Sequence, residues 1–309
     1  MIFVTSNKLK YESCKKIIPS IKRKELDLVE IQASSPVEVA LNKAKTAFSY
    51  FNEPLIINDC SFCISSLNNF PGVYASYVES TLGYDNLFNL MKTKTDKSCY
   101  YLDVLVYIDS YTYKVFTSKT LGHIATDYVE GDYFPYDKLF IKEGETKPIC
   151  FTKNNMYENS CYLELKKYLE KRKVSRGITF FDDKILLLYR RRKENGKYLE
   201  YYAIPGGGIE NETYENACIR ELKEETSIDV KVIKYLGCEE YETGICYYYL
   251  TKYLSGDIKL GGEELENNNP DNYYETRLVS IKDLDNIFIY GIGKELIKEV
   301  FRTTTSTKL

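Results

Sequence analysis

Three glutamates, Glu221, Glu224 and Glu225, stand at positions i, i+3 and i+4 within the segment Pro205 to Asp229. On a helix this spacing brings all three carboxylates to one face. Like charges packed so closely raise one another's pKa unless a cation lies among them. Carboxylate oxygens suit Mg²⁺, which keeps several waters and bridges to substrate phosphates. The spacing therefore predicts a magnesium site that neutralises phosphates and activates a water.

The residues from Gly206 to Thr226 predict a tight loop followed by a helix. Glycines from Gly206 onward let the backbone turn sharply. The segment Asn211 to Thr213 can cap a helix that runs to about Thr226. Arg220 can pair with Glu212 and fasten the loop to the helix. A solvated helix with ordinary charge patterning is the alternative interpretation, and the spacing of the whole segment argues against it.

The segment resembles the Nudix box, which reads Gly, five residues, Glu, seven residues, then Arg-Glu-aliphatic-x-Glu-Glu-x-Gly-aliphatic. One position differs, because Ser227 stands where the family has glycine. The difference does not touch a residue that would bind metal. The matching residues are Gly206, Glu212, Arg220, Glu221, Leu222, Glu224, Glu225 and Ile228.

This resemblance extends over the second half of the chain. It implies an α/β/α Nudix sandwich that hydrolyses a nucleoside diphosphate linked to a moiety X, with Mg²⁺, or Mn²⁺ in its place. Catalysis and metal binding fall to the glutamate trio, and structural roles to Gly206, Glu212 and Arg220. Nudix enzymes often recruit one more acid from a later loop, although a glutamate in an acidic loop is usually only solvated. The candidates here are Glu263, Glu264 and Glu266.

A second set of candidate residues opens the chain. Asn7 and Lys10 follow a strand-like run, where an amide and an ammonium can bind phosphate oxygens. Further segments follow in order, and over nearly all of residues 1–170 the chain resembles the inosine triphosphate pyrophosphatase family. The matching segments contain Thr5, Ser6, Asn7 and Lys10; Glu38, Ala40, Lys43 and Ala44; Asn58 and Asp59; Pro71, Gly72 and Tyr74; and Phe134, Tyr136 and Asp137.

The second resemblance implies roles for these residues. Glu38 and Asp59 bind the metal, and Asp59 also activates water as a base. A homodimer is implied as well. A strand-end aspartate and a surface glutamate are the structural alternative for the same two residues. The implied substrate-binding residues are Thr5, Asn7, Lys10, Lys43, Phe134, Tyr136, Asp137 and Lys153.

The first half departs from this family where metal and base are bound. Asn58 stands in place of an acid, and the purine-contacting Ser-His-Arg is replaced by Tyr157, Glu158 and Asn159. The single histidine of the chain, His123, lies before that region. These differences leave two interpretations, a preference for another base or a loss of catalysis. They also suggest that the Nudix-like half carries most of the catalysis.

Length and composition agree with two globular domains. A chain of 309 residues is long enough for two cores, and 44% hydrophobic with 28% charged residues is typical of globular proteins. A net charge of −3 gives no reason to expect a nucleic-acid polymer as partner. No apolar run is long enough for a bilayer, and nine cysteines, an odd number, favour reduced thiols. We expect a cytoplasmic protein that binds nucleotides and no membrane.

The pattern of elements predicts where the two domains meet. In the first half, apolar runs alternate with helix-like stretches such as Pro36 to Phe51, as in an α/β domain. Its last helix is predicted over residues 161–173. A hairpin then follows, with Asp182 and Asp183 as its turn. We therefore predict an inosine triphosphatase-like α/β domain over 1–172 and a Nudix domain over 173–309.

Together these features predict a metal-dependent nucleotide pyrophosphohydrolase that clears noncanonical or damaged nucleoside triphosphates or other nucleoside diphosphate-X compounds. One alternative is a Nudix hydrolase of ADP-ribose, dinucleotides or sugar nucleotides whose first half is an inactive scaffold. Another is a nucleotide sensor that binds without cleaving. The intact glutamate trio argues against the sensor, because a binding module does not need a hydrolytic metal site.

Overall fold

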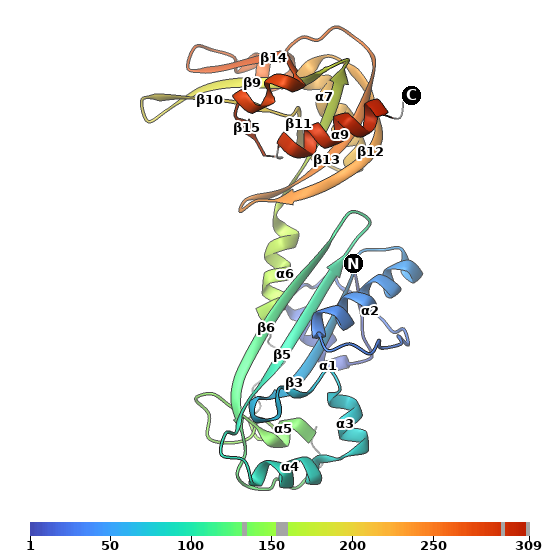
Figure 1. Cartoon of the computed structure of the whole chain (residues 1–309), viewed down its shortest axis with the longest axis vertical. Helices are drawn as coiled ribbons and strands as arrows, with labels where there is room; N and C mark the ends of the chain where they lie inside the picture. The colour runs from blue at the N-terminus through green and yellow to red at the C-terminus, as the bar shows by residue number, and fades with distance from the viewer. Residues whose placement is uncertain (132–134, 153–159, 292–293, 307–309) are drawn as a thin grey trace. The chain divides into compact units, whose positions relative to one another are not determined.

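The computed structural model describes residues 1–131, 135–152, 160–291 and 294–306. It divides into two compact units, Met1–Glu170 and Lys171–Leu309, shown in Figure 1. The first unit ends with α6 (Ser160–Glu170). The helix predicted over 161–173 is therefore too long at its end. The reason is pairing, since Arg172 and Lys173 lie opposite Gly244 and Ile245 in a parallel ladder of the second unit.

The first unit is built on one mixed sheet with strand order β2-β1-β3-β5-β6-β7, and β4 pairs with β3. Strand β1 runs parallel to both of its neighbours, and the pairs from β3 to β7 are antiparallel. The strands are β1 (Ile2–Val4), β2 (Lys22–Lys24), β3 (Leu55–Ile64), β4 (Phe70–Gly72), β5 (Ser98–Ile108), β6 (Tyr113–Ile124) and β7 (Phe140–Lys142).

Helix α2 (Pro36–Phe51) has the predicted bounds and covers one face of this sheet. Ser35 caps it and Pro36 starts it, which are favoured residues at those positions. The small residues Ala40, Ala44 and Ala47 are fully buried against strand residues of the core, so the helix packs closely. The other helices of this unit are α1 (Lys8–Ile17), α3 (Ala75–Thr81), α4 (Tyr84–Lys92), α5 (Pro135–Leu139) and α6.

The second unit is also α/β, which confirms the predicted fold class of both halves. Its strands follow the order β12-β13-β8-β9-β10-β15, with β11 beside β8 and β14 beside β9. They are β8 (Arg172–Phe181), β9 (Lys184–Glu194), β10 (Lys197–Ala203), β11 (Gly206–Gly208), β12 (Asp229–Glu240), β13 (Gly244–Ser255), β14 (Asn272–Ser280) and β15 (Ile289–Tyr290). The helices are α7 (Tyr214–Thr226), α8 (Gly262–Glu266) and α9 (Lys294–Ser306).

Strands β8 and β9 form the predicted hairpin, but they pair only next to the turn. Phe180 and Phe181 face Ile185 and Lys184. Farther from the turn β8 pairs with β13 and β11, whereas β9 pairs with β10 and β14. The two strands therefore diverge and leave space between them. Strand β8 also carries α7, because a Cβ on Gly177 would lie only 2.8 Å from a methyl of Leu222.

Candidate active sites

Helix α7 presents the glutamate trio, and both of its ends are capped. The Thr213 side chain accepts a hydrogen bond from the backbone N–H of Asn216 at 3.2 Å, which satisfies a free donor of the first turn. Ser227 ends the helix with a φ of 63°. Glycine favours this left-handed conformation, which explains why the Nudix box has glycine there. The helix is thus built as the sequence predicts despite the serine.

The three carboxylates differ in exposure and in partners. Glu225 is buried, and its Oε2 accepts a hydrogen bond from the backbone N–H of Gly206 at 2.7 Å. The side chain of Glu221 is 14% exposed and that of Glu224 is 51% exposed. The trio therefore extends from the base of the loop out to solvent.

Arg220 joins the loop to the helix through four partners. Its guanidinium donates to Glu212 at 2.8 Å, to Glu221 at 2.9 Å and to Glu224 at 3.1 Å. It also donates to the backbone carbonyl of Gly208 at 2.9 Å. The predicted pair of Arg220 with Glu212 is thus present. Burial opposes the charge of Arg220, but the hydrogen bonds to Glu212 and Glu221 outweigh this effect and raise its pKa.

Burial makes two carboxyls of this site, those of Glu225 and Glu221, harder to ionise. Burial raises the pKa of Glu225 to about 8, with the negative charge of Glu264 as the next cause. Burial raises the pKa of Glu221 as well. A cation among these oxygens would reverse both shifts. The donor set, carboxylates beside an open cavity, fits a hard divalent ion.

The carboxylates nevertheless do not form a ready metal cage. Within the part of the chain that the structure describes, no three His, Cys, Asp or Glu side chains are arranged to hold an ion. Arg220 lies against Glu221 and Glu224, and Glu225 is turned to the Gly206 amide. A metal must therefore compete with these contacts. The exposed side chain of Glu224 has the most freedom to move toward it.

Two glycines of the loop lie where a side chain would not fit. A Cβ on Gly206 would come within 2.1 Å of the Ser175 carbonyl oxygen, and its φ is 140°. A Cβ on Gly207 would lie 2.3 Å from Oε2 of Glu221. Close approach of the backbone to a carboxylate is thus the reason for glycine at 207.

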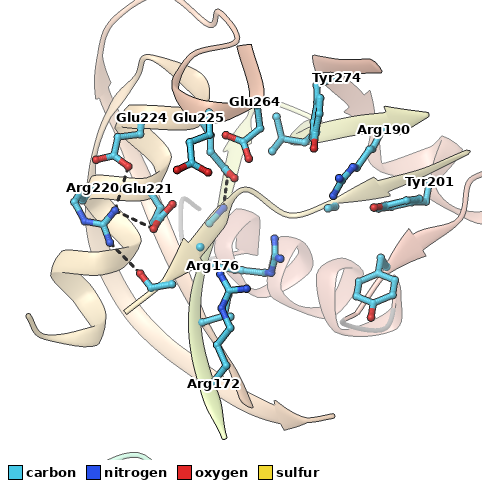
Figure 2. Close-up of a pocket in the computed structure, with 18 of the residues that line it drawn as sticks. Arg172, Arg176, Arg190, Tyr201, Arg220, Glu221, Glu224, Glu225, Glu264 and Tyr274 are labelled. Atoms are coloured by element: carbon cyan, nitrogen blue, oxygen red, sulfur yellow. Dashed lines mark hydrogen bonds and ion pairs between the residues drawn. The ribbon is translucent and has the colours of Figure 1, made fainter. Parts of the chain in front are cut away.

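A cavity of about 750 Å³ opens beside this trio, between the diverging strands. Figure 2 shows the carboxylates of α7 gathered with Glu264 at one side, while Arg190, Tyr201 and Tyr274 lie at another. Of the three candidate acids, Glu263 and Glu264 line the cavity and Glu266 does not. Residues of alternating position on β8 and β9 line it too, and the arginines among them are Arg172, Arg176, Arg190 and Arg192.

Sequence reasoning missed these arginines. Their signal is a basic residue at alternate positions of a strand, which places them on one face. That pattern alone does not show that the two strands diverge around a cavity.

In the first unit, Asp59 and Lys43 meet as a pair. Lys43 Nζ lies 2.9 Å from Oδ1 of Asp59 and 2.5 Å from Oε1 of Glu30. Burial opposes the charge of Lys43, but the attraction of Asp59 and Glu30 outweighs it and raises the pKa. The other oxygen of Asp59, Oδ2, is buried and has no hydrogen-bond partner within the described residues. An unpaired carboxylate oxygen of this kind fits a metal ion or a polarised water.

Asn58, which replaces the expected acid, is fixed in place. Its Oδ1 accepts a hydrogen bond from the Tyr162 hydroxyl at 2.9 Å, and its amide donates to the Val104 carbonyl at 3.3 Å. The predicted phosphate ligand Lys10 donates to the Asn58 backbone carbonyl at 2.9 Å. Lys10 is therefore held beside Asp59, whereas the Asn58 side chain is used within the fold.

Other predicted residues of this unit lie nearby with different partners. Asn7 caps α1 by accepting from the Lys10 backbone N–H at 3.1 Å, and Thr5 Oγ1 accepts from the Asn7 backbone N–H. Glu38 is exposed in the first turn of α2, and its carboxylate has no bonding partner among the described residues. The structure thus places Lys10 on the Asn58 carbonyl and Lys43 on Asp59, and it gives Glu38 no hydrogen bond or ion pair with them among the described residues.

Comparison with known proteins decides the family. Residues 1–161 match the Ham1 family, and residues 171–295 match the NUDIX domain. The chain belongs to the Ham1 family. It joins a Ham1 domain to a NUDIX domain, as the sequence predicted. Both families are pyrophosphatases that hydrolyse phosphoric anhydrides, and the chain is a hydrolase of this class.

Relatives of the Ham1 domain include a dITP/XTP pyrophosphatase of Korarchaeum cryptofilum, 31% identical over 150 residues, which cover 48% of this chain and 81% of the relative. Another, a dITP/XTP pyrophosphatase of Saccharolobus solfataricus, is 29% identical over 163 residues, which cover 52% of this chain and 84% of the relative. A Ham1 protein of Staphylococcus aureus has a similar structure, with a TM-score of 0.48 and 20% identity over 55% of this chain and 97% of its own. The structure of an ADP-ribose pyrophosphatase of Streptococcus suis matches with a TM-score of 0.32 and 21% identity. The match covers 42% of this chain and 92% of that protein.

Tyr136 of the Ham1 domain, a predicted substrate-binding residue, packs into the core. It is 2% exposed, packs on Phe62 with ring centroids 4.7 Å apart, and donates to the Ala75 carbonyl. The core thus takes up the ring that the sequence assigned to the substrate. Asp137 accepts from the Tyr101 hydroxyl at 3.0 Å, and burial raises its pKa to about 6.

Some predictions for the two domains fall elsewhere. Phe134, Lys153 and the segment 157–159 lie outside the described residues. No helix in the described parts of the Ham1 and NUDIX domains is long and apolar enough to cross a membrane.

Proposed function

We propose that the NUDIX domain is a metal-dependent pyrophosphohydrolase of noncanonical or damaged nucleoside triphosphates or other nucleoside diphosphate-X compounds. One observation carries this proposal. The carboxylate face of α7 borders the same cavity as the arginines and aromatic rings on the facing strands. Metal-binding carboxylates beside phosphate-binding guanidiniums and stacking rings are what a nucleotide anhydride requires.

The side chains of this cavity divide the task of binding. Glu221, Glu224 and Glu225 would hold Mg²⁺, or Mn²⁺ in its place, and a bound ion would neutralise phosphate charge and activate a water. Arg220 would keep the loop and the helix in register through Glu212. Guanidiniums pair with phosphate oxygens in a bidentate way, and the rings of Tyr201 and Tyr274 provide apolar surface for a base or a ribose.

A release screen tests this proposal. Phosphate and pyrophosphate release would be measured for ordinary and noncanonical nucleoside triphosphates, ADP-ribose, dinucleotides and sugar nucleotides, with Mg²⁺, with Mn²⁺ and with EDTA. We expect turnover of at least one substrate with a divalent ion and none with EDTA, because the trio needs a cation to act on phosphate. Turnover that EDTA leaves unchanged, or no turnover at all, contradicts the proposal.

A homodimer and a cytoplasmic location stay predictions.

We further propose that the Ham1 domain hydrolyses nucleoside triphosphates at Asp59. The unpaired, buried Oδ2 of Asp59 favours this second activity, as do the neighbouring ammonium groups of Lys10 and Lys43. The relatives of this domain are dITP/XTP pyrophosphatases. The contacts of Asn58 within the fold leave Asp59 to act without a second acid on its strand.

Asp59→Asn tests the Ham1 activity in a chain whose NUDIX site already carries Glu224→Gln. We expect Glu224→Gln to retain some release from dITP or XTP, and the double variant to lose at least about 100-fold of that rate, since a catalytic base contributes 10²–10⁴-fold. Pyrophosphate release from the two proteins is the measurement. Equal rates would mean that the Ham1 domain is a scaffold.

A further inference from the structure

A second, smaller cavity adjoins the NUDIX site. It has a volume of about 150 Å³, and Arg172, Val174, Arg176 and Tyr290 line both it and the main cavity. Its remaining wall includes residues of β13 and the segment before it, Tyr241, Thr243, Gly244, Ile245, Cys246 and Tyr248, together with Gly291. Two arginines of β8 therefore stand where the two cavities meet, next to a chamber with several hydroxyl groups.

Three of the cavity arginines form no ion pair within the described residues, although glutamates line the same cavity. Among residues 1–131, 135–152, 160–291 and 294–306, no carboxylate forms an ion pair with Arg172, Arg176 or Arg190. In contrast, Arg192 pairs with Glu194, and Arg220 with three glutamates. An anion that enters the cavity can therefore pair with Arg172, Arg176 or Arg190 without breaking an ion pair between described residues.

The guanidinium of Arg172 lies beside the loop of the catalytic segment. A Cβ placed on Gly208 would be 3.5 Å from its Nη2, and the Gly208 carbonyl accepts from Arg220. Arg176 follows on the same face of β8 and donates to the Ile204 carbonyl through Nη1. In Figure 2 both arginines rise from β8 next to the carboxylate side of the cavity. A phosphate chain that extends from the carboxylates along this cavity would therefore pass Arg172 and Arg176.

Charge decides what kind of substrate needs this arrangement. The glutamates and their metal would neutralise the diphosphate that is cleaved, so Arg172 and Arg176 are additional to what that diphosphate requires. A neutral sugar as moiety X would form no charge-assisted hydrogen bond with the exposed Arg172 or the half-buried Arg176. A further phosphate would pair with them by charge-assisted hydrogen bonds.

We propose that Arg172 and Arg176 form a subsite for a phosphate beyond the cleaved diphosphate, so that the NUDIX domain acts on chains of three or more phosphates. This inference rests on the proposed function of the NUDIX domain and names its substrate class. It favours nucleoside triphosphates and dinucleoside polyphosphates over ADP-ribose and sugar nucleotides. The small cavity lined by Tyr241, Thr243 and Tyr248 then receives the terminal phosphate.

Binding of inorganic polyphosphates tests the subsite without any turnover. Tripolyphosphate and pyrophosphate would be titrated calorimetrically with Mg²⁺ into the full chain, into Arg172→Gln and into Lys173→Gln. All three proteins would carry Lys10→Gln, which removes an ammonium from the Ham1 site. Lys173 is a matched control, because it loses the same charge at the next position of β8, whose side chain points to the opposite face. Arg172→Lys, which keeps the charge, is a second variant in case Arg172→Gln does not fold.

We expect Arg172→Gln to weaken the binding of tripolyphosphate at least about tenfold, which is the loss expected when one charge-assisted hydrogen bond is removed. Pyrophosphate affinity should change much less, Lys173→Gln should resemble the parent protein, and Arg172→Lys should lie between. An equal loss for pyrophosphate, an equal loss in Lys173→Gln, or no effect of Arg172→Gln would overturn the subsite. Binding that depends on Arg172 in a chain without hydrolysis would keep the subsite and refute the proposed function.

Discussion

Glu224→Gln is expected to lower kcat for the substrates of the NUDIX domain by about 100-fold or more, the loss typical when one electrostatic group is removed from a catalytic site. Glutamine keeps the size of the side chain, and its carbonyl oxygen can still accept from Arg220, which lies 3.1 Å from Glu224. The loop should therefore keep its shape, and the change acts on the charge that would hold the metal. Steady-state release kinetics at saturating Mg²⁺ measure the effect.

Glu215→Gln provides the matched control for this variant. Glu215 lies in the first turn of the same helix and does not line the cavity. Glu215→Gln removes the same charge as Glu224→Gln. Because the residue lies away from the cavity, kcat should stay within about twofold of the parent protein. A similar loss in both variants would mean that general helix charge, and not the trio, sets the rate.

Gly207→Ala is expected to cost about 100-fold in kcat/KM while the protein stays folded. The added methyl would lie 2.3 Å from Oε2 and 2.5 Å from Cδ of Glu221, so this carboxylate must move. A displacement of about 1 Å of a reacting group can cost about 10²-fold. Gly207 does not have a positive φ, so alanine suits its backbone, and β11 can keep its pairing of Gly207 with Ser175.

Gly208→Ala separates this steric effect from a general effect of alanine in the loop. A Cβ on Gly208 would lie 3.5 Å from Arg172, an ordinary contact, so we expect a loss below about tenfold. Thermal unfolding of both variants checks that the fold is intact. Full activity of Gly207→Ala would show that the position of Glu221 does not matter for the reaction.

Local signals in the sequence were sufficient for the catalytic segment. The i, i+3 and i+4 spacing, the cap at Thr213 and the pair of Arg220 with Glu212 depend on neighbours within one loop and one helix, and the structure contains all of them. The hairpin turn at Asp182 and Asp183 was predictable for the same reason. Residues close in sequence need no knowledge of the fold to be placed.

Distant contacts explain what the sequence did not predict. The hydroxyl that fixes Asn58 comes from Tyr162, which is 104 positions away. The burial of Tyr136 against Phe62 depends on how β3 and α5 pack. Arg176 and Arg190 face one cavity only because β8 and β9 separate after their turn. Such arrangements follow from tertiary packing, which overrides local patterns.

The direct passage from α6 to β8 makes the junction itself sensitive to insertions and deletions. Helix α6 ends at Glu170 and β8 begins at Arg172, so one residue separates them. Side chains on a strand alternate between its faces, and a slip by one position exchanges them. Pairing with β13 and β11 holds the register of β8 within the second unit. A deletion at Lys171 would therefore act on the end of α6 and on the bonds of Lys171 to Glu240 and the Tyr241 carbonyl.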